Sequence, residues 1–322
     1  MRILDTTLRE GEQTDGVTFT SKQKMKIARM LADFGVDIVE AGHPVISSYA
    51  AECVKSVANS VARLNSHTET LGHARAKIKD IDAVLACRTQ WVGIFMGINP
   101  KSLMYRYQKT KQQAIDELVQ AIVYAKENGL KVRYTIEDAT RTSIMDIVEV
   151  GKLTKEAGAD VLSLADTVGL ATPEVFYELV SKVKRTVGLN LEVHCHNDRG
   201  LALANSLAGF RAGASTIDAS INRLGERCGI TSLAELCLNL QLNGRGEWKL
   251  EKLPLLSRIV EKYSNIPINP LSPVVGKNAF THKADLHVKA MMRNAHSYEP
   301  YPPKMIGRKH KIILHHRESN NQ

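Results

Sequence analysis

Short β-branched or apolar runs alternate with helical segments eight times along this chain, and this alternation limits the possible folds more than any other feature. Such an order is typical of βα units around a parallel sheet. Eight parallel strands close into a barrel, whereas an open doubly wound sheet usually has fewer strands and a Gly-rich first turn. The predicted strands are Arg2–Leu8, Asp37–Ala41, Glu69–His73, Trp91–Gly97, Lys131–Glu137, Asp160–Asp166, Leu191–His196 and Thr216–Ile221.

The helical segments carry residues that start and stop helices. Thr20 or Ser21 is a suitable N-cap for a helix that ends at Phe34 before Gly35, and Thr172-Pro173 opens another helix. Three further helical segments are expected to end at glycines, namely Gly129, Gly158 and Gly213. The fold class predicted is therefore α/β, a (β/α)8 TIM barrel with a C-terminal helical or irregular appendage.

The pattern changes after Leu242, where Asn243-Gly244 is followed by several prolines around one helical stretch. We predict a catalytic barrel over residues 1–243 and a C-terminal subdomain over residues 244–322. The alternative is a disordered tail. The apolar residues Leu255, Ile259, Val260 and Tyr263 follow a helical spacing that favours packing instead.

Charge and cysteine content narrow the function classes. The formal net charge of +9 is compatible with nucleic acid, a membrane surface or anionic small molecules such as coenzyme A. Much of the excess lies in the last 20 residues, as in a solvated terminus, so we expect neither nucleic-acid nor membrane binding. Five cysteines without C-x-x-C spacing indicate free thiols, and the absence of a leader or a long apolar stretch predicts a cytoplasmic protein.

Polar residues at the carboxyl ends of barrel strands are expected to point into an active site. His194 and His196 are two residues apart on one strand, so both side chains can bind one divalent metal, with Glu10 as a third ligand. Zinc, manganese, cobalt, iron or magnesium would suit such a site. An isolated H-x-H more often only forms hydrogen bonds, but the carboxylate and the strand end favour a metal here.

Four further residues are candidates for binding a reacting anion. Arg9 is suited to stabilising oxyanion or enolate character, and its alternative role is an ion pair with Glu226. Arg133 and Thr135 alternate on one strand and, with Thr167, offer donors for carboxylates. An arginine is more often on the surface, but a central barrel strand makes exposure of Arg133 unexpected.

These residues lie in motifs that resemble the DRE-TIM metallolyase superfamily over nearly the whole chain. The opening D-T-T-L-R-[DE]-G is intact from Asp5 to Gly11, and the strand-seven H-x-H is His194 to His196. Further matches are Ile136-Glu137-Asp138-Ala139-Thr140-Arg141, Ala165-Asp166-Thr167-Val168-Gly169 and Leu224-Gly225-Glu226-Arg227-Cys228-Gly229-Ile230. The resemblance implies a metal-dependent enzyme of the acyl-CoA condensing branch, which comprises isopropylmalate, citramalate and homocitrate synthases.

Four details resemble homocitrate synthases most closely. Glu10 stands where isopropylmalate synthases usually have Asp, and Ile230 stands where these synthases and the lyases have Asn. Arg133 precedes Tyr134-Thr135, as an arginine precedes Phe-Ser in homocitrate synthases. The tail segment Phe280-Thr281-His282-Lys283-Ala284-Asp285-Leu286-His287 resembles F-T-H-K-A-G-I-H, and Tyr298-Glu299 follows at the family spacing.

The resemblance implies a role for each residue. Glu10, His194 and His196 would hold the metal that binds a 2-oxo acid, with Gln13, Arg133, Thr135 and Thr167 binding substrate. Arg9, Glu137, His287 and Tyr298 would be catalytic, with His287 deprotonating acetyl-CoA. The tail of such synthases crosses to the partner subunit, which implies a homodimer. Asp285 replaces the family Gly and is expected to raise the pKa of His287, and His73 has no firm place in the alignment.

Three alternatives stay open. A sibling synthase would use 2-oxoisovalerate, pyruvate, oxaloacetate or a phosphono-oxo acid, and an apolar substrate would leave a buried Arg133 unpaired. A retro-aldol lyase of the superfamily is disfavoured by Ile230 and by the His287/Tyr298 tail. A binding protein without activity would be expected to lack a site residue, and none is missing.

Overall fold

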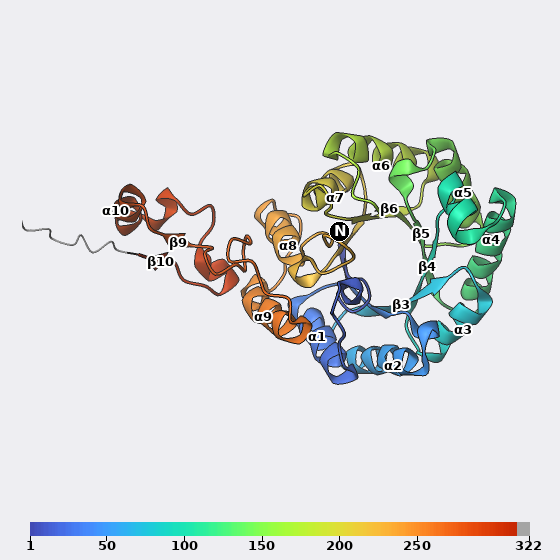
Figure 1. Cartoon of the computed structure of the whole chain (residues 1–322), viewed down its shortest axis with the longest axis horizontal. Coiled ribbons are helices and arrows are strands. Elements are labelled where there is room, and N and C mark those ends of the chain that lie inside the picture. Colours follow the sequence, from blue (N-terminus) through green and yellow to red (C-terminus); the bar gives the residue numbers. More distant parts are fainter. Residues whose placement is uncertain (314–322) are drawn as a thin grey trace, which may run out of the picture.

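The computed structural model describes residues 1–313, in which eight parallel strands close into a barrel surrounded by helices (Figure 1). β1 (Arg2–Asp5) pairs with both β2 (Ile38–Gly42) and β8 (Thr216–Ala219), so the predicted (β/α)8 barrel is confirmed. The remaining barrel strands are β3 (Glu69–Arg75), β4 (Trp91–Met96), β5 (Lys131–Ile136), β6 (Val161–Asp166) and β7 (Asn190–Cys195). The helices are α1 (Ser21–Phe34), α2 (Ser48–Ala62), α3 (Ile78–Ala86), α4 (Lys111–Glu127), α5 (Ile144–Glu156), α6 (Pro173–Val187), α7 (Ala202–Arg211), α8 (Leu233–Leu242), α9 (Leu253–Ser264) and α10 (Asp285–Arg293).

The predicted helix caps form as local chemistry dictates. The Thr20 hydroxyl oxygen accepts a hydrogen bond from the backbone N–H of Gln23, and the Gln23 side-chain oxygen accepts one from the backbone N–H of Thr20, which closes a capping box at the start of α1. Gly35 ends α1 with φ 110°, a left-handed conformation that glycine adopts without steric cost. Thr172 caps α6 ahead of Pro173, also as predicted.

The first strand is shorter than predicted, because it ends at Asp5 rather than at Leu8. The Asp5 carboxylate accepts a hydrogen bond of 2.9 Å from the Thr7 backbone N–H, and the N–H groups of Arg9 and Glu10 both bond to the Thr6 carbonyl. These bonds form a turn. Arg9 and Glu10 are therefore held over the end of the barrel instead of continuing along its wall.

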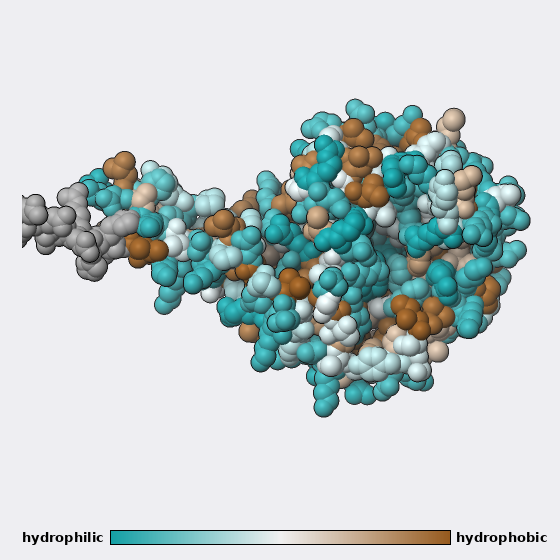
Figure 2. Space-filling model, in the orientation of Figure 1, coloured by the Kyte–Doolittle hydropathy of each residue, from teal (hydrophilic) through white to brown (hydrophobic). Residues whose placement is uncertain are grey.

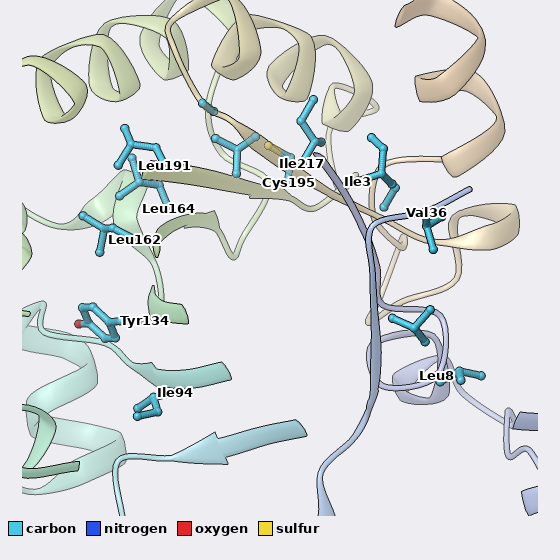
Figure 3. Packing of buried hydrophobic residues seen from close by; sticks show 14 of the residues in the cluster. Ile3, Leu8, Val36, Ile94, Tyr134, Leu162, Leu164, Leu191, Cys195 and Ile217 are labelled. Carbon is cyan, nitrogen blue, oxygen red and sulfur yellow. The ribbon is translucent and has the colours of Figure 1, made fainter. Parts of the chain in front are cut away.

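The outward faces of the strands form the main hydrophobic core with the helices. Figure 3 shows side chains such as Ile94, Tyr134, Leu164, Leu191 and Ile217 along the successive strands, and all of them are fully buried. Because side chains alternate along a strand, the residues next to these point into the barrel. Tyr134 thus packs outside while Arg133 and Thr135 face inside.

The barrel interior has two chemically different layers. At the amino ends of the strands an apolar floor forms from Leu4, Ile38, Leu71, Trp91 and Val161. Above it is a layer of buried charged residues that we call the charged layer: Glu40, Arg133, Glu192 and Asp218. The charged layer is the base on which the cavity at the carboxyl ends of the strands is built.

The chain beyond α8 has two parts. Leu253, Leu256 and Val260 on α9 are buried, and α9 packs against α1 on the outside of the barrel. Residues 265–313, which we call the arm, follow α9. Val274 and Ile306 of the arm are buried in the main core, whereas α10 and the two-stranded pair β9 (Thr281–His282) and β10 (Lys311–Ile312) extend away from the barrel (Figure 1). The domain boundary after residue 243 stays a prediction.

The arm presents apolar side chains to its surroundings. Figure 2 shows hydrophobic residues scattered over its surface, and Leu271, Leu286 and Met292 are each more than 70% exposed. Within residues 1–313, no helix has the length and apolar character needed to cross a membrane.

Candidate active site

A cavity of about 760 Å³ opens at the carboxyl ends of the barrel strands. Most of the predicted site residues line it, which agrees with the position of active sites in barrels of this kind. The predicted residues along its wall are Arg9, Glu10, Gln13, Arg133, Thr135, Glu137, Thr167, His194 and His196.

Glu10, His194 and His196 converge at one side of this cavity, and their possible ligand atoms all lie within 4.8 Å of one another. His194 and His196 approach to 3.2 Å between their Nε2 atoms, and Glu10 Oε1 lies 3.8 Å from His196 Nε2. The backbone N–H of Glu226 donates to Glu10 Oε1 at 3.0 Å. Two imidazoles and one carboxylate form a donor set suited to zinc, manganese, iron or cobalt, so these side chains fit a divalent metal.

The electrostatics of this cluster also favour a metal. Burial lowers the pKa of His194 and of His196 to about 4, so both rings are neutral at pH 7, the form that binds metals. His194 Nδ1 lies 2.9 Å from Asp218, an arrangement that orients its other nitrogen toward the site. Burial opposes ionisation of Glu10, but Arg9 and the two histidines lower its pKa to about 2.

Arg9 pairs with Glu10 and Glu40 rather than with Glu226, which had been its alternative partner. Its Nε donates to the Glu40 carboxylate at 2.8 Å, and its Nη1 contacts the Glu10 carboxylate. The guanidinium is therefore fixed beside the candidate metal ligands, where it can stabilise negative charge that develops on a bound oxygen.

Arg133 is fully inside the charged layer and has three carboxylate partners. It lies 2.9 Å from Glu40, 3.0 Å from Glu192 and 3.5 Å from Asp218. The expectation that an apolar substrate would leave this cation unpaired is therefore wrong, because the protein itself supplies the counter-ions. The burial of Arg133 therefore gives no reason to prefer an acidic 2-oxo acid over an apolar one.

Hydroxyl groups remain available for a ligand in the same cavity. Thr135 Oγ1 is buried and has no hydrogen-bond partner among residues 1–313. Thr167 Oγ1 accepts from the Asp138 backbone N–H at 2.8 Å, which leaves its own proton free to be donated. Both residues therefore meet the chemical requirement for binding a carboxylate.

Glu137 is held at the rim by a segment that the sequence did not indicate as functional. A short π-type helix, Ser102–Tyr107, places Arg106 Nη1 2.7 Å from Glu137 Oε1 and the Tyr107 hydroxyl 2.6 Å from Glu137 Oε2. Burial and the nearby Glu137 carboxylate raise the pKa of Tyr107, so its hydroxyl stays protonated and donates.

Comparison with known proteins places this geometry in a family. Residues 1–260 match the HMGL-like family, and residues 274–322 match the homocitrate synthase post-HMGL domain-like family. The chain belongs to the HMGL-like family. It therefore belongs with the DRE-TIM enzymes that its motifs resemble, and the match to the second family covers most of the arm.

Curated relatives carry two names. A homocitrate synthase from Pyrococcus horikoshii is 43% identical over 97% of this chain and 85% of that protein. A 2-isopropylmalate synthase from Methanocaldococcus jannaschii is 42% identical over 97% of this chain, and the chain spans only 60% of that protein. An HMG-CoA lyase structure from Bacillus subtilis aligns with a TM-score of 0.76 at 19% identity, covering 85% of this chain and 96% of that one, which supports the fold.

The structure does not bring every predicted residue of this HMGL-like chain to the cavity. His287 and Tyr298 lie on the arm, where their rings stack at 3.9 Å between centroids and do not line the cavity of their own barrel. Asp285 begins α10 two residues before His287. Within one chain, α10, which carries His287, lies far from β5, which Glu137 directly follows (Figure 1).

Sequence reasoning missed three residues of the charged layer and left His73 unassigned. Glu192 precedes His194 by two positions on β7, a spacing that places both on one face and could have indicated it. Glu40 and Asp218 gave no comparable signal. His73 lines the cavity, bonds to Glu40 through Nδ1 at 2.9 Å and stacks on Phe95 with 4.4 Å between ring centroids.

Proposed function

We propose that this enzyme condenses acetyl-CoA with a 2-oxo acid, and that the acid is 2-oxoglutarate, giving homocitrate and free CoA. The observation that carries the proposal is the convergence of Glu10, His194 and His196 beside Arg9 in one cavity. A metal site next to a fixed guanidinium suits a reaction in which a carbonyl oxygen gains negative charge.

Support for 2-oxoglutarate comes from the relatives rather than from Arg133. Two homocitrate synthases are 43% identical to this chain, and the alignment covers 85% of each of them. Most of the arm also matches a domain family named after these synthases. The 2-isopropylmalate synthase at 42% identity supports 2-oxoisovalerate as the second candidate. The ion pairs of Arg133 are compatible with either acid.

The chemistry follows from the positions of the side chains. A divalent metal held by Glu10, His194 and His196 would supply Lewis-acid polarisation of the keto group. Thr167 would donate to the 1-carboxylate of the oxo acid, and Arg9 would stabilise charge on the former keto oxygen. A ring nitrogen of His287 would take a proton from the acetyl methyl group, and the resulting carbanion would form the new carbon–carbon bond. Water then hydrolyses the thioester and releases CoA.

The arm is the part of this proposal that needs a second subunit. His287 and Tyr298 are remote from the cavity of their own barrel, and the arm extends outward with exposed apolar side chains. We propose a homodimer in which each arm reaches over the partner's cavity and brings His287 and Tyr298 to the partner's Glu137. Such an exchange would also cover the apolar surface of the arm.

An assay of free CoA tests the proposed function. Purified protein is incubated with acetyl-CoA, a divalent metal and one 2-oxo acid at a time, and thiol release is followed with a chromogenic reagent. We expect turnover with 2-oxoglutarate above a blank without acid. Turnover only with another oxo acid would retain the condensation and reject the substrate, and no release with any acid would favour a lyase.

Subunit complementation tests the exchanged arm. Glu137→Gln and His287→Ala subunits, each inactive alone, are co-expressed with different tags, and the doubly tagged dimer is purified. Each such dimer has one site with an intact barrel and an intact arm, so we expect about half of the wild-type activity per dimer. Failure to recover activity in a purified doubly tagged dimer would show that the arm does not act on the partner's barrel.

A further inference from the structure

Tyr107 connects the ends of two neighbouring barrel strands. Gly97 directly follows β4 and Glu137 directly follows β5, and these strands pair as far as Met96 and Ile136. The Tyr107 hydroxyl accepts a hydrogen bond from the backbone N–H of Gly97 at 3.3 Å and donates one to Glu137 Oε2 at 2.6 Å. Because a hydroxyl has only one proton to donate, this proton is committed to Glu137.

The backbone around Tyr107 places its side chain against these strand ends. A Cβ atom on Gly97 would come within 2.7 Å of Ser102 Oγ, so the close approach of the segment depends on the absence of a side chain there. Gln108 ends the π-type helix in the left-handed conformation, with φ 51°. The position of Tyr107 is therefore set by its own segment and not only by the bond to Glu137.

The two oxygens of the Glu137 carboxylate are held differently. Oε2 accepts from the Tyr107 hydroxyl, and burial and this carboxylate raise the pKa of Tyr107, so the hydroxyl remains a donor. Oε1 lies 2.7 Å from Arg106 Nη1, but the Arg106 side chain is 53% exposed, and such an ion pair contributes little to stability. Arg106 also lies over the rings of Phe95 and Tyr107, and these contacts do not depend on Glu137. Oε1 is therefore the oxygen that can change its partner.

We propose that Tyr107 is a positioning residue for proton removal, because it holds Glu137 through Oε2 and leaves Oε1 to accept from His287 of the partner subunit once Arg106 moves away. One ring N–H of His287 then donates to Oε1, and the other ring nitrogen is free to take a proton from the acetyl methyl group. The neighbouring carboxylate stabilises the imidazolium that forms. This inference rests on the proposed function and on the exchanged arm.

The kinetic test is Tyr107→Phe, which removes the hydroxyl and keeps the ring. We expect kcat to fall roughly 10- to 100-fold, the effect of losing one hydrogen bond to a charged group. The KM of the oxo acid should change less than about threefold, because the residues proposed to bind it are intact. With acetyl-CoA deuterated at the methyl group, the isotope effect on kcat should exceed the wild-type value, since proton removal becomes the slow step. The same loss of kcat with an unchanged or smaller isotope effect would overturn the proposal, because a different step would then be damaged.

Two variants of the same segment separate positioning from general damage. Tyr105→Phe is the matched control, because it removes a hydroxyl from a residue that is 77% exposed, and it should keep the wild-type kcat and isotope effect. Arg106→Gln removes the contact to Oε1, which is given up before the reaction, so the isotope effect should stay at the wild-type value. A rise as large as that of Tyr107→Phe would show that Oε1 is not the oxygen left to His287.

The bond between Tyr107 and Glu137 can be tested without any turnover. Urea unfolding of the wild type, Tyr107→Phe, Glu137→Ala and the double variant gives a double-mutant cycle. The losses should be coupled, so that Tyr107→Phe destabilises the wild type more than it destabilises Glu137→Ala. Additive losses would mean that the hydroxyl does not hold the carboxylate, and the proposal would fail. Absence of turnover with every oxo acid, together with coupled losses, would reject the proposed function and leave the hold of Tyr107 on Glu137 in place.

Discussion

His196→Ala is expected to lose bound metal and to lower kcat by about a thousandfold, which corresponds to about 4 kcal/mol of transition-state stabilisation. His196 is one of three candidate ligands whose atoms lie within 4.8 Å of one another. With it removed, one imidazole and one carboxylate cannot hold a metal in competition with buffer. Metal content after dialysis and kcat at saturating metal check the prediction.

The same variant should also lose stabilisation by metal. A metal at 100 times its dissociation constant stabilises the folded wild type by about 2.7 kcal/mol, which raises the midpoint of thermal unfolding. His196→Ala should show little of this rise. His67→Ala is the control, because the His67 side chain is 63% exposed and lies outside the cavity. If His196→Ala retained stoichiometric metal, the ligand set assigned to this site would be wrong.

Arg133→Met should lower the free energy of unfolding by roughly 3–5 kcal/mol, because three buried acidic groups, those of Glu40, Glu192 and Asp218, lie within 3.5 Å of the guanidinium. Glu40 is ionised and would lose one of its two cations, while burial raises the pKa of Glu192 to about 8 and that of Asp218 to about 7, so these two would mainly lose a polar partner. Methionine fills much of the same volume, so the loss reflects charge rather than a cavity. Urea unfolding of the metal-free protein measures it.

A substitution in a surface ion pair is the control for this prediction. Lys249 also pairs with a carboxylate, that of Asp33 at 3.0 Å, but both side chains are more than half exposed. Lys249→Met should therefore cost less than about 1 kcal/mol. Equal losses for the two variants would show that the ion pairs of the charged layer have no special weight in stability.

The local patterns of the sequence were sufficient to predict the barrel. Strand alternation and caps such as Thr20 and Gly35 depend on residues close together in the chain, and these features formed as predicted. The end of β1 was misplaced because the turn depends on one side-chain bond from Asp5 to the Thr7 backbone. The short π-type helix at Ser102–Tyr107 left no periodic signal to detect.

The site was predictable only where its residues are close in sequence or lie in a recognised motif. His194 and His196 share one strand, and Glu10 lies in the opening motif. The counter-ions of Arg133 come from three other strands, and their approach depends on how the strands are arranged around the barrel. In the proposed homodimer, the position of His287 over a site depends on a second subunit, which one chain does not contain.

The contacts around the charged layer join two of the candidate metal ligands by a continuous chain of ion pairs and polar contacts. It runs from Glu10 through Arg9, Glu40, Arg133 and Asp218 to His194. A new side chain anywhere along it disturbs several neighbours at once. Other residues that line the cavity, such as His43, Ile46 and Phe95, are not members of this chain of contacts. Evolution toward a different oxo acid would therefore be expected to begin at those positions, where substrate preference can change while the catalytic half of the cavity is inherited intact.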